Sequence, residues 1–302
     1  MQVYIALANS GWGYVFNGRK ENEIMNIYLA GSYTRPYVYN EKKEDMNIYL
    51  AGAASGNNAA QHKDGRAVDL FYSCVKQVNK VYVLESFYYI KDWMIPFIKN
   101  HWNFLLDSGA FTFMANAKAG NGINWDEYIE KYAAFINEND IKLFFELDID
   151  SVVGLKEVER LREKLERLTG KRSIPVWHKS RGLDYWKQMV RDYDYVAIGG
   201  IVTKEIKNHD IFIPLLKIAK EHNCKVHGLG FTQEKGMQKY KFHSVDSTAW
   251  IYGNRGGFLY SFNGKTLDKI MKPEKTRLAS KEVAVHNFTE WVKFQRYAER
   301  NL

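Results

Sequence analysis

Three aspartates end apolar runs of the sequence, a pattern expected where parallel strands deliver side chains to a reaction site. Asp107 ends the run 103–107, Asp148 ends 142–148 and Asp246 ends 242–246. Short apolar runs bounded by turn residues are typical of buried parallel strands. If the three strands belong to one barrel, their carboxyl ends meet at one mouth, where such folds carry their chemistry. We therefore expect the three carboxylates to lie close together.

Glycine turns and aromatic side chains follow other runs and suggest a flat ligand. Gly199 and Gly200 follow one run, Gly228 begins the turn at 228–230, and His178 ends the run 174–178. Glycine lets backbone amides approach a ligand closely, because no Cβ intervenes. Acids, bare backbone and aromatic walls suit a neutral, planar, donor-rich ligand such as guanine. The alternative is that aspartates after strands cap the next helix or fix a turn.

Further side chains near these runs have two interpretations each. Phe111 and Trp177 either stack on a base or pack in the barrel, and His178 either contacts substrate or is structural. Three basic residues follow or precede the last run, and we predict that they contact nucleic-acid phosphates. The alternative is a solvated basic face. They are Lys239, Lys241 and Arg255.

Strand and helix patterns alternate along the chain and predict the fold. Helical patterns occur at 126–137, where Asn124 is the expected N-cap, and at 155–168, 185–191, 211–222 and 282–300. Eight strand candidates, with helical patterns between most of them, favour an α/β fold, a (β/α)8 TIM barrel forming a single domain with a C-terminal helix. The expected strands are 47–52, 81–86, 103–107, 142–148, 174–178, 195–199, 225–230 and 242–246.

The N-terminal part contains an internal repeat. Segments 1–8, 25–31 and 46–52 are near copies, and only three occur, so a solenoid is not expected. We predict that the third copy is the first barrel strand. Residues 1–45 then form a duplicated extension packed on the barrel domain 46–302.

Composition limits the class of protein. The 302 residues are 46% hydrophobic, with no run of about 18 apolar residues that would span a membrane. No secretory signal is expected, and two cysteines, Cys74 and Cys224, fit a reducing compartment, so we expect a cytoplasmic protein. Cys224 and His227 fall short of a zinc ligand set, so no metal or cofactor is expected. The net charge of +8 favours a polyanionic partner, although solubility alone would also explain it.

Five motifs together resemble the tRNA-guanine transglycosylase superfamily. They are Asp-Ser-Gly-Ala-Phe at 107–111, Phe-Glu-Leu-Asp at 145–148, Ala-Ile-Gly-Gly-Ile at 197–201, His-Gly-Leu-Gly at 227–230 and Val-Asp at 245–246. The order and spacing agree over roughly residues 100 to 260. The tRNA enzymes carry a zinc site after the nucleophile, whereas this chain has no cysteine beyond Cys224. In this respect it looks more like the phage DpdA-type DNA-guanine transglycosylases.

The resemblance implies a pentosyltransferase that exchanges guanine in DNA for a free 7-deazaguanine base. It implies that Asp246 is the nucleophile, that Asp107 is the general acid and base, and that Asp148 reads the base with Gly199 and Gly200. Asp150 is a supporting candidate. Such enzymes often pair as homodimers. The alternatives are a tRNA-directed enzyme, an N-glycosidase that releases the base to water, and a catalytically silent barrel that binds nucleic acid or a modified base.

Overall fold

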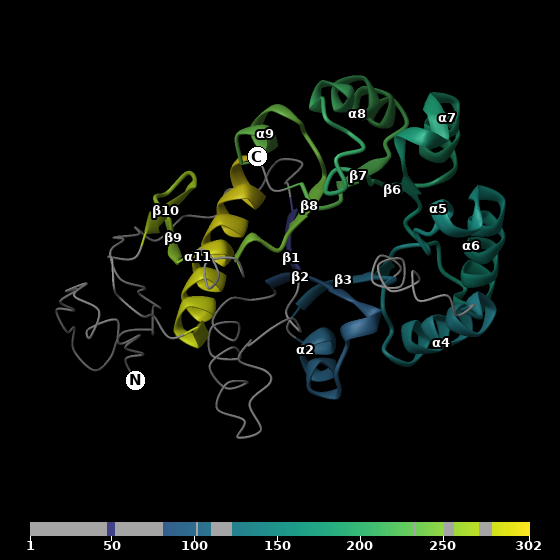
Figure 1. Cartoon of the computed structure of the whole chain (residues 1–302), viewed down its shortest axis with the longest axis horizontal. Coiled ribbons are helices and arrows are strands. Elements are labelled where there is room, and N and C mark those ends of the chain that lie inside the picture. The colour runs from purple at the N-terminus through teal and green to yellow at the C-terminus, as the bar shows by residue number, and fades with distance from the viewer. Residues whose placement is uncertain are drawn as a thin grey trace.

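Eight parallel strands form the centre of the protein in a computed structural model (Figure 1). The structure describes residues 47–51, 81–100, 102–109, 123–231, 234–250, 257–271 and 280–302. The strands are β1 (Asn47–Ala51), β2 (Val81–Ser86), β3 (Trp102–Asp107), β4 (Leu143–Phe144), β5 (Val176–Trp177), β6 (Tyr195–Ile198), β7 (Lys225–Gly228) and β8 (Ser244–Ser247). Their order in the sheet is β4-β3-β2-β1-β8-β7-β6-β5, so neighbours in the chain are neighbours in space.

A bridge between the two outermost strands completes the ring. Phe145, directly after β4, pairs in parallel with Ile174, two residues before β5. The amide of Ile174 donates to the carbonyl of Phe144 at 2.8 Å, and the amide of Glu146 donates to Ile174 at 3.1 Å. The predicted α/β barrel is therefore confirmed, and the third copy of the N-terminal repeat is its first strand. Residues 1–45, the predicted extension, lie outside the described residues.

Helices connect most of the strands. α4 begins after Asn124, whose side chain accepts from the amide of Glu127 as the predicted N-cap does, and α6 ends at Gly170 in the left-handed conformation. None of the described helices is long and apolar enough to cross a membrane. The helices are α2 (Ile95–Asn100), α4 (Trp125–Glu138), α5 (Asp150–Val153), α6 (Leu155–Thr169), α7 (Gly182–Asp192), α8 (Phe212–Glu221), α9 (Glu234–Lys239) and α11 (Ser280–Asn301). Single 3-10 turns are η3 (Phe87–Tyr89), η4 (Asp92–Met94), η6 (Lys179–Arg181) and η7 (His209–Ile211).

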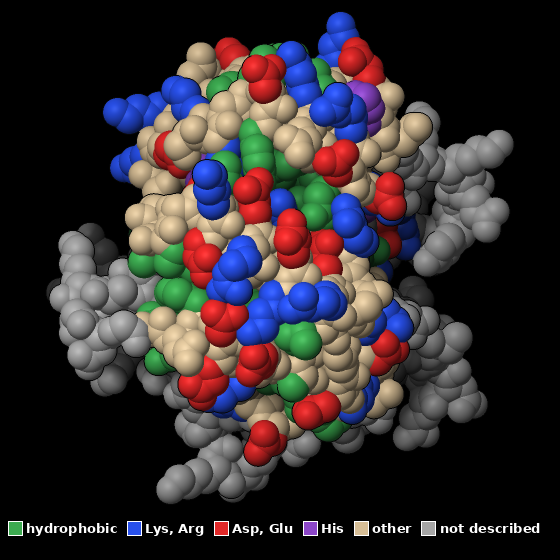
Figure 2. Space-filling model, turned by 90° about the vertical axis from the view of Figure 1, so that its right-hand side faces the viewer, with side chains coloured by type: hydrophobic (Ala, Val, Ile, Leu, Met, Phe, Trp, Pro, Cys, Tyr) green, Lys and Arg blue, Asp and Glu red, His purple; other side chains and the backbone are tan. Residues whose placement is uncertain are grey.

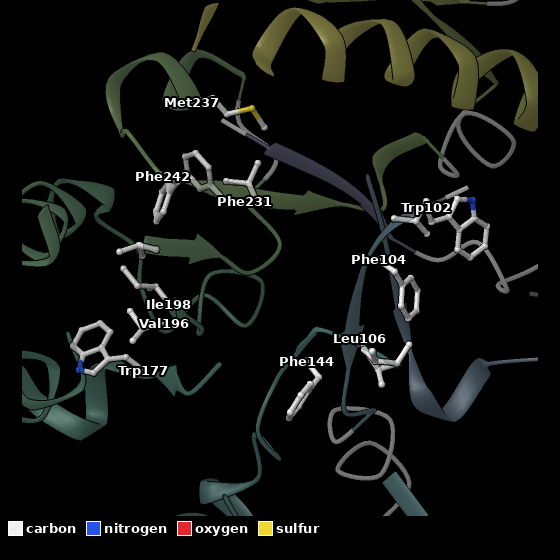
Figure 3. Packing of buried hydrophobic residues seen from close by; sticks show 14 of the residues in the cluster. Trp102, Phe104, Leu106, Phe144, Trp177, Val196, Ile198, Phe231, Met237 and Phe242 are labelled. Carbon is white, nitrogen blue, oxygen red and sulfur yellow. The ribbon is translucent and has the colours of Figure 1, made fainter. Parts of the chain in front are cut away.

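Alternation along the strands separates two apolar layers. The outer layer includes helix residues and outward strand residues such as Phe104, Leu106 and Ile198 (Figure 3). The inner layer consists of strand positions and their extensions inside the barrel. Because successive strand residues face opposite sides, Asp107, His178 and Gly199, two positions after Leu105, Val176 and Ala197, continue the inner face toward the barrel mouth. The inner residues are Leu84, Leu105, Phe145, Ile174, Val176 and Ala197.

A hairpin after the barrel was not expected from the sequence. β9 (Phe258–Phe262) and β10 (Leu267–Met271) pair in antiparallel fashion and contact α11. The amide of Tyr260 donates to Asn287 at 2.8 Å, and the amide of Phe262 donates to Glu290 at 2.7 Å. The predicted C-terminal helix is confirmed, and its side chains accept hydrogen bonds from two amides of β9.

Charges alternate in sign over the helical face. Figure 2 shows lysines and arginines interspersed with acidic side chains on the side of the molecule that carries α4 and α6. Asp126 pairs with Arg160 at 2.8 Å and with Lys164 at 2.7 Å. The excess positive charge of the chain is therefore not gathered on this face.

Candidate active site at the carboxyl ends of the strands

The predicted acidic residues come together at one mouth of the barrel. Asp107 ends β3, Asp148 lies between β4 and α5, and Asp246 lies near the end of β8. The negative charges of Asp148 and Asp246 both raise the pKa of Asp107. Because all eight strands are parallel, their carboxyl ends share this mouth, as the sequence predicted.

The Asp246 carboxylate is held by one of its two oxygens. Oδ1 accepts from the amide of Gly230 at 2.5 Å and lies 3.2 Å from Nε2 of His227. Among the residues that the structure describes, none forms a hydrogen bond with Oδ2. A Cβ on Gly230 would lie 2.2 Å from Cγ2 of Val202, and the backbone there has φ +68°. Only a glycine at this position therefore lets the amide donate to Asp246. The arrangement leaves one carboxylate oxygen available to a substrate.

Asp107 is set up to exchange a proton near neutral pH. Burial raises its pKa to about 6; the charges of Asp148 and Asp246 act in the same direction, against the hydrogen bond from Gly109. That bond joins the Gly109 amide to Oδ2 at 3.0 Å. A carboxyl group with a pKa near the working pH can serve as both acid and base.

Asp148 is fixed by a histidine. Its Oδ1 lies 2.7 Å from Nε2 of His178, and Nδ1 of the same ring lies 3.1 Å from Oε2 of Glu205. Burial acts to lower the pKa of His178, but the hydrogen bond and charge of Asp148, together with the bond to Glu205, raise it to about 9. His178 is therefore an imidazolium at neutral pH. The structure places His178 beside Asp148 in the mouth, in contact with two carboxylates. Its predicted contact with a substrate stays a prediction.

The glycine pair after β6 makes room for these side chains. A Cβ on Gly199 would lie 2.7 Å from Cε1 of His178, and one on Gly200, where φ is +77°, would lie 2.6 Å from Oε2 of Glu205. Gly199 and Gly200 are thus needed for the His178 and Glu205 contacts. Their predicted contact with a base stays a prediction.

A group of side chains in this mouth has the composition of a cation site. Ligand-type atoms of Asp148, Asp150 and His178 lie within 4.8 Å of one another. However, Oδ2 of Asp150 accepts from Nε of Arg181 at 2.9 Å, and Asp148 is paired with the imidazolium. These positive partners account for the two carboxylates without a metal ion, so we assign no metal to them.

Gly228 and Trp177 pack against the outer apolar layer. A Cβ on Gly228 would meet Phe231 and Phe242 at 3.2 Å in the outer apolar layer, so packing explains this glycine. The buried indole of Trp177 also lies in that layer and donates to the carbonyl of Gly182 at 2.8 Å, which contradicts a stacking role (Figure 3). Phe111 and Arg255 lie outside the described residues.

The two predicted phosphate-binding lysines are engaged within the protein. Lys239 pairs with Asp210 at 2.5 Å, and Lys241 donates to the Leu302 carbonyl at 3.2 Å. Lys241 precedes the first residue of β8, so it lies toward the opposite end of this strand from Asp246. Net charge could not locate a nucleic-acid surface, because it carries no positional information.

Sequence reasoning missed an aromatic pair at the rim of the mouth. Tyr88 and Tyr89 follow β2 and remain 48% and 41% exposed, with ring centroids 5.0 Å apart. Cβ of Tyr88 lies 3.0 Å from the position of a Cβ on Gly109, which places this tyrosine beside the Asp107 turn. Their position directly after a strand was the available signal.

Comparisons with known proteins do not assign a family. No family model and no curated protein matches the chain. A mutant tryptophan synthase α-subunit from Pyrococcus furiosus is similar at 15% identity and a TM-score of 0.40, over 71% of this chain and 92% of that one. The carboxyl transferase domain of Rhizobium etli pyruvate carboxylase is similar at 13% identity and a TM-score of 0.40, over 85% of this chain and 48% of that one. These weak likenesses say nothing about activity, and the fold rests on the strand order itself.

Proposed function

We propose that the protein is a DNA-guanine transglycosylase, a pentosyltransferase that exchanges guanine in DNA for a free 7-deazaguanine base. The observation that carries this proposal is the pairing of two different carboxyl groups in one mouth. Asp246 has one carboxylate oxygen to which no described residue hydrogen-bonds, and Asp107 has a pKa raised to about 6. A nucleophile beside a separate acid and base is what a double displacement at an anomeric carbon requires.

In the first displacement, Oδ2 of Asp246 attacks C1′ of the guanosine nucleotide. The bond from C1′ to N9 breaks, its electron pair goes to the base, and Asp107 supplies the proton that makes guanine a neutral leaving group. The product is a glycosyl ester of Asp246. Burial, together with the charges of Asp148 and Asp246, raises the pKa of Asp107 to about 6, so more of the protonated acid is present than for an ordinary aspartate.

In the second displacement, the ionised Asp107 removes the N9 proton of the incoming 7-deazaguanine. N9 then attacks C1′, the ester bond breaks, and its electron pair returns to Asp246. The enzyme is regenerated with Asp107 protonated, and the configuration at C1′ is retained after two inversions.

Base recognition falls to Asp148. Its Oδ1 is occupied by His178, and no described residue bonds to Oδ2, which can accept from the N1–H and the exocyclic amine of guanine. His178 fixes the orientation of the carboxylate. Since C1′ and the base edge are enclosed in a duplex, the target nucleotide has to be unpaired or flipped. The rings of Tyr88 and Tyr89 are exposed, which supports a role for them in stacking on a displaced base.

The choice of DNA rests on the resemblance to the zinc-free phage enzymes, so the test includes both nucleic acids. Purified protein is incubated with guanine-containing DNA or tRNA and a panel of 7-deazaguanine bases, and digested nucleosides are identified by mass spectrometry. We expect a 7-deazaguanine nucleoside in DNA only, and none with Asp246→Asn. Incorporation into tRNA alone would move the substrate to RNA. Free guanine released without incorporation would indicate a glycosidase, and binding without either product would indicate a silent barrel.

A further inference from the structure

A chain of buried and half-buried polar side chains crosses the inside of the barrel and ends on Asp246. The Tyr195 hydroxyl lies 2.5 Å from Oγ of Ser244, and Oγ lies 2.5 Å from Nδ1 of His227. Nε2 of His227 lies 3.2 Å from Oδ1 of Asp246. His227 and Ser244 have no exposed surface, and they are register partners on β7 and β8. The chain therefore joins three neighbouring strands beneath the mouth.

The chemistry of these groups sets which atom carries the proton toward Asp246. An ionised carboxylate only accepts hydrogen bonds, so Nε2 has to be the donor. Ser244 holds the other end of the ring, because its hydroxyl donates to Nδ1 of a neutral imidazole or accepts from an imidazolium. In both cases the Tyr195 hydroxyl can form the remaining hydrogen bond with Ser244, since a phenol can donate or accept. The His227 ring is thus fixed at both nitrogens, with Nε2–H aimed at Oδ1.

We infer that His227 is a positioning residue for the Asp246 nucleophile and stabilises its charge when it leaves. This inference rests on the proposed double displacement. If Oδ2 attacks C1′, Oδ1 becomes the carbonyl oxygen of the glycosyl ester and stays between the Gly230 amide and His227. In the second displacement negative charge returns to the carboxylate. The two donors are already in position at Oδ1 and stabilise this charge, as the donors of an oxyanion hole do.

The two steps respond differently when the donor is removed. A carboxylate with one donor fewer is a less stabilised anion, so its attack in the first step is slowed mainly by its looser orientation. Its expulsion in the second step loses the stabilisation directly. His227→Leu should therefore slow the second step more than the first, and the covalent glycosyl-enzyme should accumulate. A residue with a purely structural role would lower both steps together.

The kinetic test compares wild type, His227→Leu and His227→Gln by rapid quench with guanine-containing DNA and a 7-deazaguanine base. Glutamine places an amide donor near the position of Nε2. We expect His227→Leu to slow exchange about 100-fold, within the range for losing one such donor, and to raise the adduct fraction. His227→Gln should restore most of the rate and lower the adduct fraction again. Unchanged exchange in His227→Leu, or equal losses in both variants without adduct, would overturn the inference.

A second measurement does not depend on activity. Ring ¹⁵N and ¹H resonances of His227 are recorded in wild type, Asp246→Asn and Ser244→Ala. We expect a proton on Nε2 in wild type, with the Nε2 signal shifted by Asp246→Asn and the Nδ1 signal shifted by Ser244→Ala. An unprotonated Nε2 would contradict the inference whatever the enzyme does. Wild type that neither exchanges bases nor forms an adduct, but shows the expected resonances, would refute the proposed function and leave His227 as a carboxylate-binding residue only.

Discussion

Replacing Asp107 should stabilise the protein at alkaline pH, because an ionised carboxylate is costly at this position. The pKa of Asp107 is raised from 3.8 to about 6, chiefly by burial. A carboxyl group whose pKa is higher in the folded state gives a stability that is complete below 3.8 and is lost as pH rises through about 6. At about 1.4 kcal/mol per pH unit, this difference corresponds to about 3 kcal/mol. It is an upper limit, because the side chain keeps partial contact with solvent.

Asp107→Asn keeps an oxygen that can accept from the Gly109 amide but cannot ionise. Its free energy of unfolding relative to wild type should therefore rise by up to about 3 kcal/mol between pH 4 and pH 8. Urea unfolding followed by circular dichroism at several pH values measures the difference. Asp184→Asn is the matched control, because that side chain is fully exposed on α7 and its difference should stay flat. A flat difference for Asp107→Asn as well would refute the raised pKa and the acid–base role that depends on it.

Three other substitutions test separate parts of the account. Glu146 is completely buried between two arginines, so Glu146→Ala should lower the free energy of unfolding by about 3 to 5 kcal/mol in urea, and a loss below about 1 kcal/mol would contradict a structural ion pair. Gly199→Ala should displace the ring of His178 and weaken 7-deazaguanine binding about tenfold in calorimetry, whereas unchanged affinity would contradict the recognition role. Tyr88→Ala should weaken binding of single-stranded DNA by about 1 to 3 kcal/mol without changing affinity for the free base, and the equally exposed Leu183→Ala should leave both unchanged.

The strands and the position of their carboxylates were accessible from the sequence, because parallel barrel strands are apolar and their carboxyl ends share one mouth. The run ending on Asp107 predicted both β3 and the location of its carboxylate. The predicted strand 142–148 is shorter in the structure, where only Leu143–Phe144 and the bridge at Phe145 pair. Directly after this bridge, Glu146 pairs with Arg162 of α6 and Arg181 of η6, which an apolar pattern does not reveal.

The partners of the site residues were not accessible in the same way. His227 and Ser244 are 17 positions apart, and only the register of β7 against β8 brings them together under Asp246. Lys241 lies before the start of β8, at the end of the strand opposite the mouth. Its basic charge alone does not reveal this position. Local patterns give strands and caps, whereas contacts between strands follow from register and barrel closure.

The central claim is that Asp246 becomes covalently bonded to C1′ of the nucleotide. The direct measurement is to incubate the protein with guanine-containing single-stranded DNA, quench it in acid and map the adduct by peptide mass spectrometry. We predict a deoxyribosyl-linked DNA adduct on the peptide that contains Asp246, released when a 7-deazaguanine base is added before the quench. Base exchange that proceeds without an adduct, or with Asp246→Asn as fast as wild type, would contradict the account.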